Sequence, residues 1–317
     1  MRYIEQLREG ESVREIYLCK NKQSAVTKNG KPYDSVLLQD KTGTLDAKIW
    51  DPNSVGIDDF DALDYIEVTG DMTSFNGMLQ MSIKRVRKVH EGEYVPGDYL
   101  PVSEKDIEEM YKELIGLVNS VKNEYLKTLL KKFFVENSEF ITEFKKHSAA
   151  KSVHHGFIGG LLEHTLSVAK LCDFYSMNYG AVLKRDLLIT VAMLHDIGKI
   201  WEISDFPVND YTDDGQLLGH IIIGTEKVSA AISTIPGFPK QLAAEVKHCI
   251  LAHHGEYEYG SPKKPAIIEA LALHYADNTD AKIQTMKELL SSNADNNDWL
   301  GFNRLLDTNV RRTLGVE

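Results

Sequence analysis

Ionisable side chains gather in the middle of this 317-residue chain, where ten of its eleven histidines lie between His147 and His274. Five histidines and two aspartates fall in apolar settings that are expected to face inward. They are His164, His195, Asp196, His220, His253, His254 and Asp277. Burying a carboxylate is costly unless a cation compensates it, and few lysines or arginines lie near these positions. We therefore expect these side chains to converge on one or two divalent metal ions.

Each of these residues taken alone is explained as well by a hydrogen-bonded core histidine or a buried His–Asp pair, but seven together favour a metal site. The donor set contains nitrogen and oxygen atoms but no thiolate. It indicates Mn, Fe, Co, Ni or Zn in an open catalytic site rather than a structural cysteine site. The three cysteines lack CxxC spacing and are interpreted as free thiols in a reducing cytosol.

Helices must bring these residues together, and the pattern from residue 103 onward is helical. Ser103 and Asp106 have the spacing of a capping box, and apolar residues then recur at helical intervals almost to the C-terminus. An apolar run from Leu187 to Leu194 leads directly into His195 and Asp196. We predict an all-α helical bundle over residues 103–317.

The first ninety residues show the alternation that is typical of β-strands. Apolar and polar side chains alternate in residues 43–50, and Asn76-Gly77 is a strong hairpin signal. Five strands are expected, the first over Val13–Lys20, with one or two helical turns in the acidic segment 58–64 after the third. This order predicts a small all-β OB-fold barrel over residues 1–90.

Residues 91–102 separate the two predicted domains. They contain two prolines and two glycines and show no clear periodicity, so they are predicted to form a linker.

The net charge of −11 is spread unevenly along the chain. Residues 1–90 carry 13 basic and 14 acidic groups, whereas the remainder carries 23 basic and 33 acidic groups. An acidic protein repels polyanions at long range, so a nucleic-acid ligand would require local basic patches or metal ions. No apolar run approaches the length of a membrane span, and the charged N-terminus has no signal-peptide core. A cytoplasmic protein without membrane association is expected.

The series His164, His195-Asp196 and Asp277 resembles the H…HD…D pattern of the HD-domain superfamily of metal-dependent phosphohydrolases, and HDIGK at 195–199 is a form common there. The resemblance implies that His164, His195, Asp196 and Asp277 hold one metal ion. Asp196 would bridge to a second ion, completed by His220, His253 and His254. Lys199 matches a lysine that is directed at a phosphate oxygen. Gly160 stands where some relatives carry an extra glutamate ligand, which argues against a third metal.

A resemblance to the YhaM family covers the full length. It rests on an OB domain followed by an HD domain, with HHGFIGGLLEHTLSVA at 154–169 and HYADNTDAK at 274–282. It implies a 3′–5′ exoribonuclease that hydrolyses single-stranded RNA, and in some members single-stranded DNA, to nucleoside 5′-monophosphates. The expected nucleophile is a hydroxide activated by two metal ions, with Mn²⁺ favoured over Co²⁺, Fe²⁺, Ni²⁺ and Zn²⁺. Asp196 and Lys199 would be the catalytic residues.

Substrate contacts are expected mainly from the barrel, because OB folds bind single strands by aromatic stacking and a basic groove. The candidates are Lys28, Tyr33, Trp50 and Phe75, and the segment Asn21–Gly30 is predicted to be a flexible basic loop. His154 and His155 belong to the family motif without matching a metal ligand. They are candidates for contact with a substrate phosphate, or else surface residues near a helix start.

Two other functions fit the same residues. One is a phosphodiesterase or phosphohydrolase acting on cyclic dinucleotides or mononucleotides, for which the metal site would serve equally well. The other is an OB-fold binding protein with a non-catalytic HD platform, against which the intact ligand series argues. The sequence leaves open the native metal, the preference for RNA or DNA, and whether the chain forms a homo-oligomer.

Overall fold

The computed structural model describes residues 1–151, 155–294 and 296–314. Its contacts divide the chain into two compact units, Met1–Pro101 and Val102–Glu317. The division falls within the segment predicted as a linker. Tyr99 in that segment is buried, its ring lies 5.2 Å from that of Tyr65, and its carbonyl accepts a hydrogen bond from Gln39. The first unit therefore includes ordered chain beyond residue 90.

The first unit is a closed five-stranded barrel with the strand order β1-β2-β3-β5-β4. Its strands are β1 (Ser12–Val26), β2 (Pro32–Asp40), β3 (Gly43–Ile49), β4 (Tyr65–Phe75) and β5 (Met78–Lys88). β3 and β5 pair in parallel, while the other neighbouring strands are antiparallel. This Greek-key arrangement confirms the predicted OB fold.

β1 is longer than predicted because an irregularity lets it serve both sides of the barrel. Its pairing register with β2 shifts between Cys19 and Asn21, and such bulges bend a strand. Residues 12–18 pair with β4, whereas residues 18–19 and 21–26 pair with β2. The prediction of a flexible loop over residues 21–30 is therefore wrong for its first half.

The acidic segment 58–64 is not helical, contrary to the prediction. Phe60 within it is buried in the barrel core, and Asp58 accepts a hydrogen bond from the backbone of Lys88. These contacts with the barrel fix the segment as extended chain and turns.

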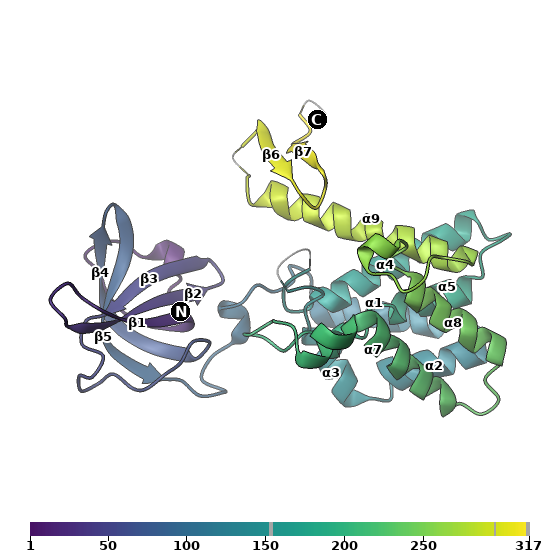
Figure 1. The fold of residues 1–317 in the computed structure, drawn as a ribbon, viewed down its shortest axis with the longest axis horizontal. Coiled ribbons are helices and arrows are strands. Elements are labelled where there is room, and N and C mark those ends of the chain that lie inside the picture. The colour runs from purple at the N-terminus through teal and green to yellow at the C-terminus, as the bar shows by residue number, and fades with distance from the viewer. Residues whose placement is uncertain (152–154, 295, 315–317) are drawn as a thin grey trace. The chain divides into compact units, whose positions relative to one another are not determined.

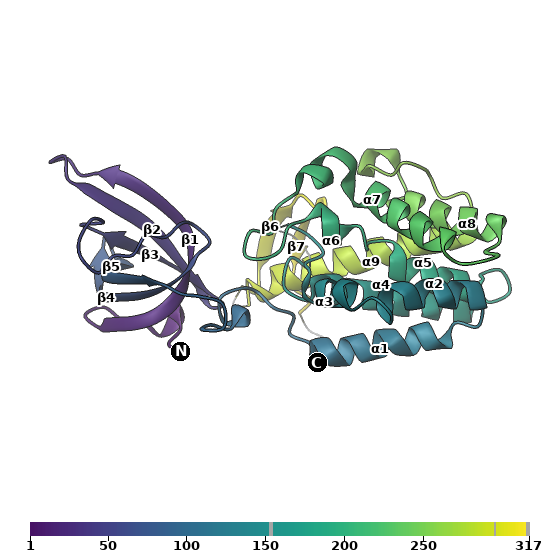
Figure 2. The same cartoon turned by 90° about the horizontal axis from the view of Figure 1, so that it is seen from below.

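The second unit is built mainly of helices around one apolar core (Figures 1 and 2). The helices are α1 (Ile107–Ser120), α2 (Glu124–Phe134), α3 (Ser138–Lys146), α4 (Gly160–Asn178), α5 (Arg185–Leu194), α6 (Lys199–Glu202), α7 (Asp213–Ser233), α8 (Lys240–Ala252) and α9 (Ile268–Ser291). Every residue of α5 from Leu187 to Leu194 is buried, and the helix contacts α2, α4, α8 and α9. An apolar helix of this kind belongs at the centre of a bundle.

A β-hairpin follows α9, at the end where the sequence pattern predicted helix (Figure 1). It consists of β6 (Trp299–Asn303) and β7 (Thr308–Arg311). Two such short strands, one interrupted by Gly301 at a φ of 88°, give almost no period-two signal in a sequence. Among the described residues, no helix combines the length and apolar character needed to span a membrane.

Candidate metal centre

The seven predicted ligands come from five helices of the second unit, most of them at or beside helix ends. His164 lies in α4 and Asp277 in α9, while His195 and Asp196 directly follow α5. His220 lies in α7, and His253 and His254 directly follow α8. The buried helix α5 therefore carries the central pair, and its neighbours supply the other side chains.

Two glycines allow the backbone around these residues to come close. Gly198 packs so tightly on α7 that an added Cβ would lie 2.0 Å from the carbonyl oxygen of His220. Gly219 adopts φ 73° and ψ 157°, which interrupts the helical path of α7 directly before His220. The interruption frees the backbone N–H of His220, which donates to the Glu202 carboxylate at 2.9 Å.

Asp196 lies at the centre of the cluster and is 2% exposed. Its Oδ2 is 3.3 Å from Nε2 of His164 and 3.3 Å from Nε2 of His195. Its Oδ1 faces a different pair, at 3.4 Å from Nε2 of His220 and 3.6 Å from Nε2 of His253. The two carboxylate oxygens thus face two different pairs of imidazoles, although a ligand atom of His253 also lies within 4.8 Å of those of His195 and Asp277.

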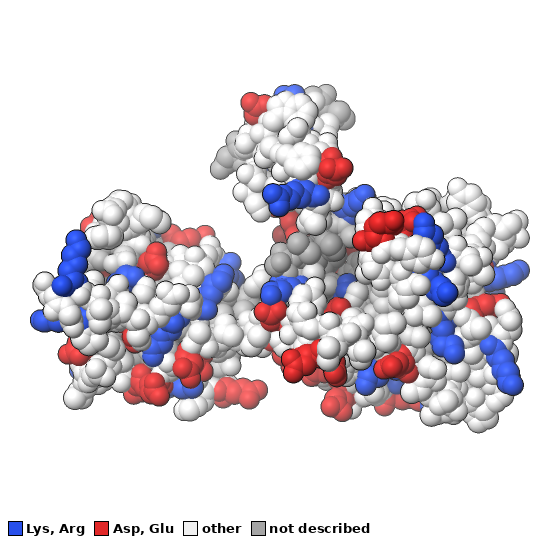
Figure 3. Space-filling model, in the orientation of Figure 1, with Lys and Arg blue, Asp and Glu red and all other residues white. Residues whose placement is uncertain are grey.

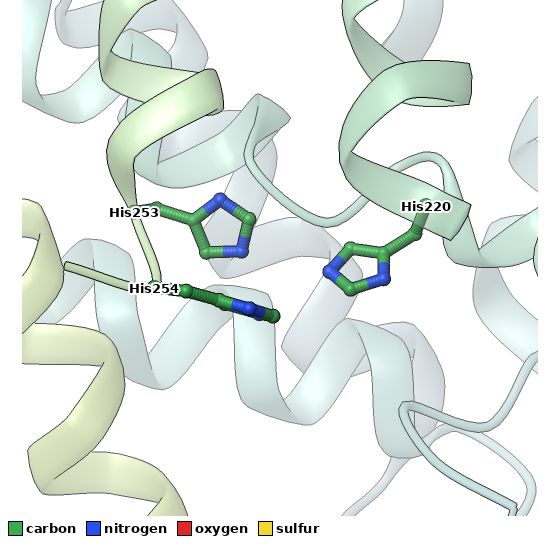
Figure 4. A group of neighbouring side chains, drawn as sticks. All are labelled: His220, His253 and His254. Atoms are coloured by element: carbon green, nitrogen blue, oxygen red, sulfur yellow. The ribbon is translucent and has the colours of Figure 1, made fainter. Parts of the chain in front are cut away.

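The remaining two predicted ligands each join one of these sets. Asp277 Oδ1 lies 3.2 Å from Nε2 of His164. His254 belongs to the other set, since ligand atoms of His220, His253 and His254 all lie within 4.8 Å of one another. Figure 4 shows these three rings turned toward a common space. The structure therefore brings all seven predicted residues together.

Each of the five imidazoles is held through Nδ1, which leaves Nε2 directed at the cluster. The Nδ1 atoms of His195, His253 and His254 lie 2.8, 2.7 and 2.8 Å from backbone carbonyl oxygens. Those of His164 and His220 lie 2.7 and 2.9 Å from carboxylate oxygens. Because these partners accept hydrogen bonds, each Nδ1 carries a proton, and in the neutral form of each ring Nε2 presents a lone pair.

Buried polar atoms without partners show that the donor set fits metal ions. Among the described residues, Asp196 Oδ1, His220 Nε2 and His253 Nε2 are buried and make no hydrogen bond. An unsatisfied buried polar group typically costs about 1–3 kcal/mol, so three at one point need a compensating partner. A divalent cation would accept all three lone pairs.

The electrostatics of the cluster agree with a cation at this point. Burial lowers the pKa of His254 to about 3 and also lowers the pKa of His253, so both rings are neutral ligands at pH 7. Burial alone would raise the pKa of Asp196, but neighbouring His195 and Lys199 hold it well below its usual range. Although burial opposes it, the surrounding carboxylates raise the pKa of His164 well above its usual value. The site thus combines the neutral imidazoles of His253 and His254 with ionised carboxylates that favour nearby positive charge.

Lys199, which the family resemblance directs at a substrate phosphate, lies inside the cluster. Its Nζ is 2.6 Å from Asp196 Oδ2, and the side chain is largely buried. Burial opposes the charged ammonium, but the Asp196 carboxylate outweighs this and raises the pKa of Lys199. The lysine is therefore a fixed positive charge beside the predicted bridging carboxylate.

His155 is 2% exposed, so its interpretation as a surface residue is wrong. Its Nε2 lies 2.9 Å from Asp280 Oδ2, directly behind His164. His154 lies outside the described residues. Asp280 and Glu202 were both missed by the sequence interpretation. The only signals for them are that Asp280 lies one turn after Asp277 and Glu202 lies one turn after Lys199.

In the barrel, the predicted substrate-binding residues lie on the β2–β3 side and at two loops. The rings of Tyr33 on β2 and Trp50 after β3 are 5.4 Å apart, and Trp50 is 54% exposed. Lys28 is exposed in the loop between β1 and β2, and Phe75 is exposed at the hairpin between β4 and β5. This strand face and these two loops form the nucleic-acid surface of OB folds.

Basic side chains are interspersed with acidic ones on the face of each unit seen in Figure 3. A mixed surface exerts little long-range attraction on a polyanion. Binding of a nucleic acid would therefore depend on local contacts such as the Tyr33–Trp50 pair.

Parts of the chain are similar to a known domain family and to solved structures. The HD domain family matches residues 161–282, which implies binding of divalent metal by the His/Asp clusters described above. Two solved structures are each similar to part of the chain. A replication protein A heterotrimer bound to ssDNA is 18% identical, with a TM-score of 0.22, over 28% of this chain and 64% of that chain. The second OB-fold domain of replication protein A from Methanococcus maripaludis is 19% identical, with a TM-score of 0.23, over 29% of this chain and 96% of that chain.

Curated relatives match nearly the whole sequence. Proteins named 3′–5′ exoribonuclease YhaM from Geobacillus sp. (strain WCH70), Bacillus velezensis and Bacillus subtilis (strain 168) are 33%, 34% and 34% identical. Each match covers 89% of this chain and 86%, 88% and 88% of the respective relative. The chain therefore belongs to the YhaM family of 3′–5′ exoribonucleases.

Proposed function

We propose that this chain hydrolyses single-stranded RNA from its 3′ end to nucleoside 5′-monophosphates, at a centre of two divalent metal ions bridged by Asp196. The observation that carries the proposal is that the two oxygens of Asp196 face different histidines. Oδ2 faces His164 and His195, while Oδ1 faces His220 and His253. The direction of cleavage and the RNA substrate are taken from the names of the relatives.

The seven ligands would divide into one set for each ion. His164, His195 and Asp277 would hold one ion with Asp196 Oδ2, and His220, His253 and His254 would hold the other with Oδ1. When bound, such ions lower the pKa of water from about 15.7 to about 7 and neutralise charge on a phosphate. We propose Mn²⁺ because the resemblance to the YhaM family favours it, and imidazole nitrogens with carboxylate oxygens and no thiolate can bind this ion.

The ammonium group of Lys199 would add a positive charge beside the reacting phosphate, in addition to those of the metal ions. Its ammonium is fixed next to Asp196, and it donates hydrogen bonds through Nζ. A preorganised donor of this kind stabilises the charge that develops on phosphate oxygens during in-line displacement. We therefore assign Lys199 to transition-state stabilisation and Asp196 to metal binding.

The barrel would bind the single strand while its 3′ end is cleaved. Half-buried Tyr33 and exposed Trp50 form an aromatic pair, and Phe75 and Lys28 lie at two loops. Bases stack on exposed aromatic rings without regard to sequence, which suits an enzyme that must advance along any strand. Single-stranded DNA would bind by the same contacts.

Incubation of the full chain with 5′-labelled single-stranded RNA and Mn²⁺ tests the proposal. Stepwise shortening from the 3′ end with release of 5′-mononucleotides is expected. Internal cuts, or faster hydrolysis of a cyclic dinucleotide than of the oligonucleotide, would instead support the small-substrate alternative. A chain that binds RNA but cleaves none of these substrates would support the binding-protein alternative.

A further inference from the structure

In the five imidazoles of the metal centre, Nδ1 forms a hydrogen bond with one of two kinds of partner, a backbone carbonyl or a carboxylate. His195, His253 and His254 donate from Nδ1 to the backbone carbonyls of Ala192, Ile250 and Tyr259. His164 and His220 instead face carboxylates, with Asp280 Oδ2 at 2.7 Å and Glu202 Oε1 at 2.9 Å. A carboxylate partner makes the imidazole a stronger electron donor than a carbonyl partner does.

The two carboxylate-backed histidines lie on opposite sides of Asp196. Nε2 of His164 is 3.3 Å from Oδ2, and Nε2 of His220 is 3.4 Å from Oδ1. Each half of the centre therefore contains one histidine of this kind. Asp280 and Glu202 come from different helices, α9 and α6, so the two supports are structurally independent.

Asp280 is held by donors on both oxygens. Oδ2 accepts from Nε2 of His155 at 2.9 Å as well as from His164, and Oδ1 accepts from the hydroxyl of Ser167. The atoms of His155, His164 and Asp280 are close enough to suggest a further ion, but separations of 2.7 and 2.9 Å are those of hydrogen bonds. His164 also directs its other nitrogen to the centre. Asp280 is thus a hydrogen-bonded support for His164.

Glu202 is held by the backbone of the residue that it supports. Its Oε1 accepts from both the backbone N–H and Nδ1 of His220, each at 2.9 Å. The backbone contact exists because α7 is interrupted at Gly219. Gly215 packs against Glu202 so closely that an added Cβ would lie 2.1 Å from the glutamate carbonyl oxygen. This packing fixes Glu202 relative to α7 and hence relative to the His220 ring.

We propose that Asp280 and Glu202 are positioning residues, one for each half of the metal centre. Each keeps the proton on Nδ1 of its histidine, directs the Nε2 lone pair to the cluster, and strengthens that ligand. The proposal rests on the proposed two-metal function, and it assigns roles to two residues that contact neither metal nor substrate. Loss of such a support typically weakens metal binding by about 10–100-fold.

The test is Mn²⁺ titration of the metal-free full chain, measured by calorimetry and by the EPR signal of free Mn²⁺. In Asp280→Asn a single amide oxygen replaces two acceptor oxygens and the negative charge is lost, so one of two Mn²⁺ affinities should fall by about 100-fold. Glu202→Gln keeps an acceptor oxygen but removes the charge, so the other affinity should fall by about 10-fold. In the double variant, both Mn²⁺ affinities should fall. Raising Mn²⁺ should restore turnover in each single variant, which a merely structural defect would not allow.

Glu269→Gln is the matched control, because Glu269 is a buried carboxylate on α9 that accepts from the backbone N–H of Lys184, away from the cluster. It should bind Mn²⁺ like the wild type. If Asp280→Asn does not fold, Ser167→Ala removes one donor to Asp280 and should weaken the same site to a smaller extent.

Three failures are distinguishable in this experiment. Wild-type protein that binds two Mn²⁺ ions, with unchanged affinities in both single variants, would overturn the positioning roles while leaving the metal centre intact. Variants that weaken the same one of the two affinities would overturn the assignment of one support to each half. A wild-type chain that binds no Mn²⁺ would overturn the proposed function itself.

Discussion

The helical unit and the barrel expose their functional side chains in opposite ways. In the helical unit, Asp196 is 2% exposed and each imidazole around it is fixed by a hydrogen bond. In the barrel, Trp50 and Phe75 are 54% and 64% exposed, and Trp50 contacts another aromatic ring. Buried groups that share one charge balance act as a unit, whereas exposed stacking surfaces contribute separately. Substitutions should therefore be severe in one unit and graded in the other.

The largest effect is expected for Asp196→Ala, which removes the oxygens that face both sets of histidines. Turnover of single-stranded RNA should fall by at least about a thousandfold, or roughly 4 kcal/mol in activation free energy. The apolar core of the helical unit is untouched, so circular dichroism should show an intact fold. Near-normal turnover in the purified variant with Mn²⁺ present would contradict the role of Asp196.

Lys199→Ala separates charge stabilisation from metal binding within the same cluster. Loss of one preorganised donor to a transition-state oxygen typically costs about 10²–10³ in kcat, and a similar loss is expected here. Mn²⁺ binding, measured by titration, should persist because both oxygens of Asp196 remain. Loss of Mn²⁺ together with activity would show that Lys199 supports the ligands instead.

Trp50→Ala tests the barrel, and its effect should appear in binding. Loss of one stacked base typically costs about 1–3 kcal/mol, which corresponds to roughly 5–150-fold weaker binding of single-stranded RNA. At saturating RNA, kcat should change little. Phe174→Ala is the matched control, since Phe174 is 60% exposed on α4 of the helical unit. Equal loss of RNA affinity in both variants would contradict a specific role for the barrel surface.

The smallest effect is expected for Lys28→Ala in the loop between β1 and β2. A lysine that neutralises one phosphate of a single strand contributes about 0.7 to the slope of log K against log salt. The slope for RNA binding should become less steep by about that amount, as measured by fluorescence anisotropy over a salt series. An unchanged slope would remove Lys28 from the proposed binding surface.

The sequence was sufficient for the parts of the molecule that carry a local signal. Helical spacing placed the seven predicted ligands on inward faces, and alternation identified the barrel strands. Asp280 shares the helical face of Asp277, but nothing in the sequence marks it as the partner of His164, which lies 116 residues earlier. Only the packing of α9 on α4 brings the two residues together. Sequence separation of this size hides a support even when its own helix is predicted.

Tertiary contacts also decided the elements that were predicted wrongly. The acidic segment 58–64 is predicted to form one or two helical turns, but burial of Phe60 in the barrel core holds it as extended chain and turns. The bulge between Cys19 and Asn21 depends on pairing with two different strands, which a single segment does not reveal. The hairpin of β6 and β7 is too short for its alternation to stand out.

Asp196 is proposed to join the two halves of the metal centre, and counting bound Mn²⁺ ions tests this bridging role most directly. Metal-free full chain is titrated with Mn²⁺, and bound ions per chain are determined for the wild type and for Asp196→Ala. The bridging role predicts two bound ions in the wild type and severe weakening of both sites in the variant, since each oxygen of Asp196 faces one set of histidines. Two tightly bound ions in the variant would contradict it.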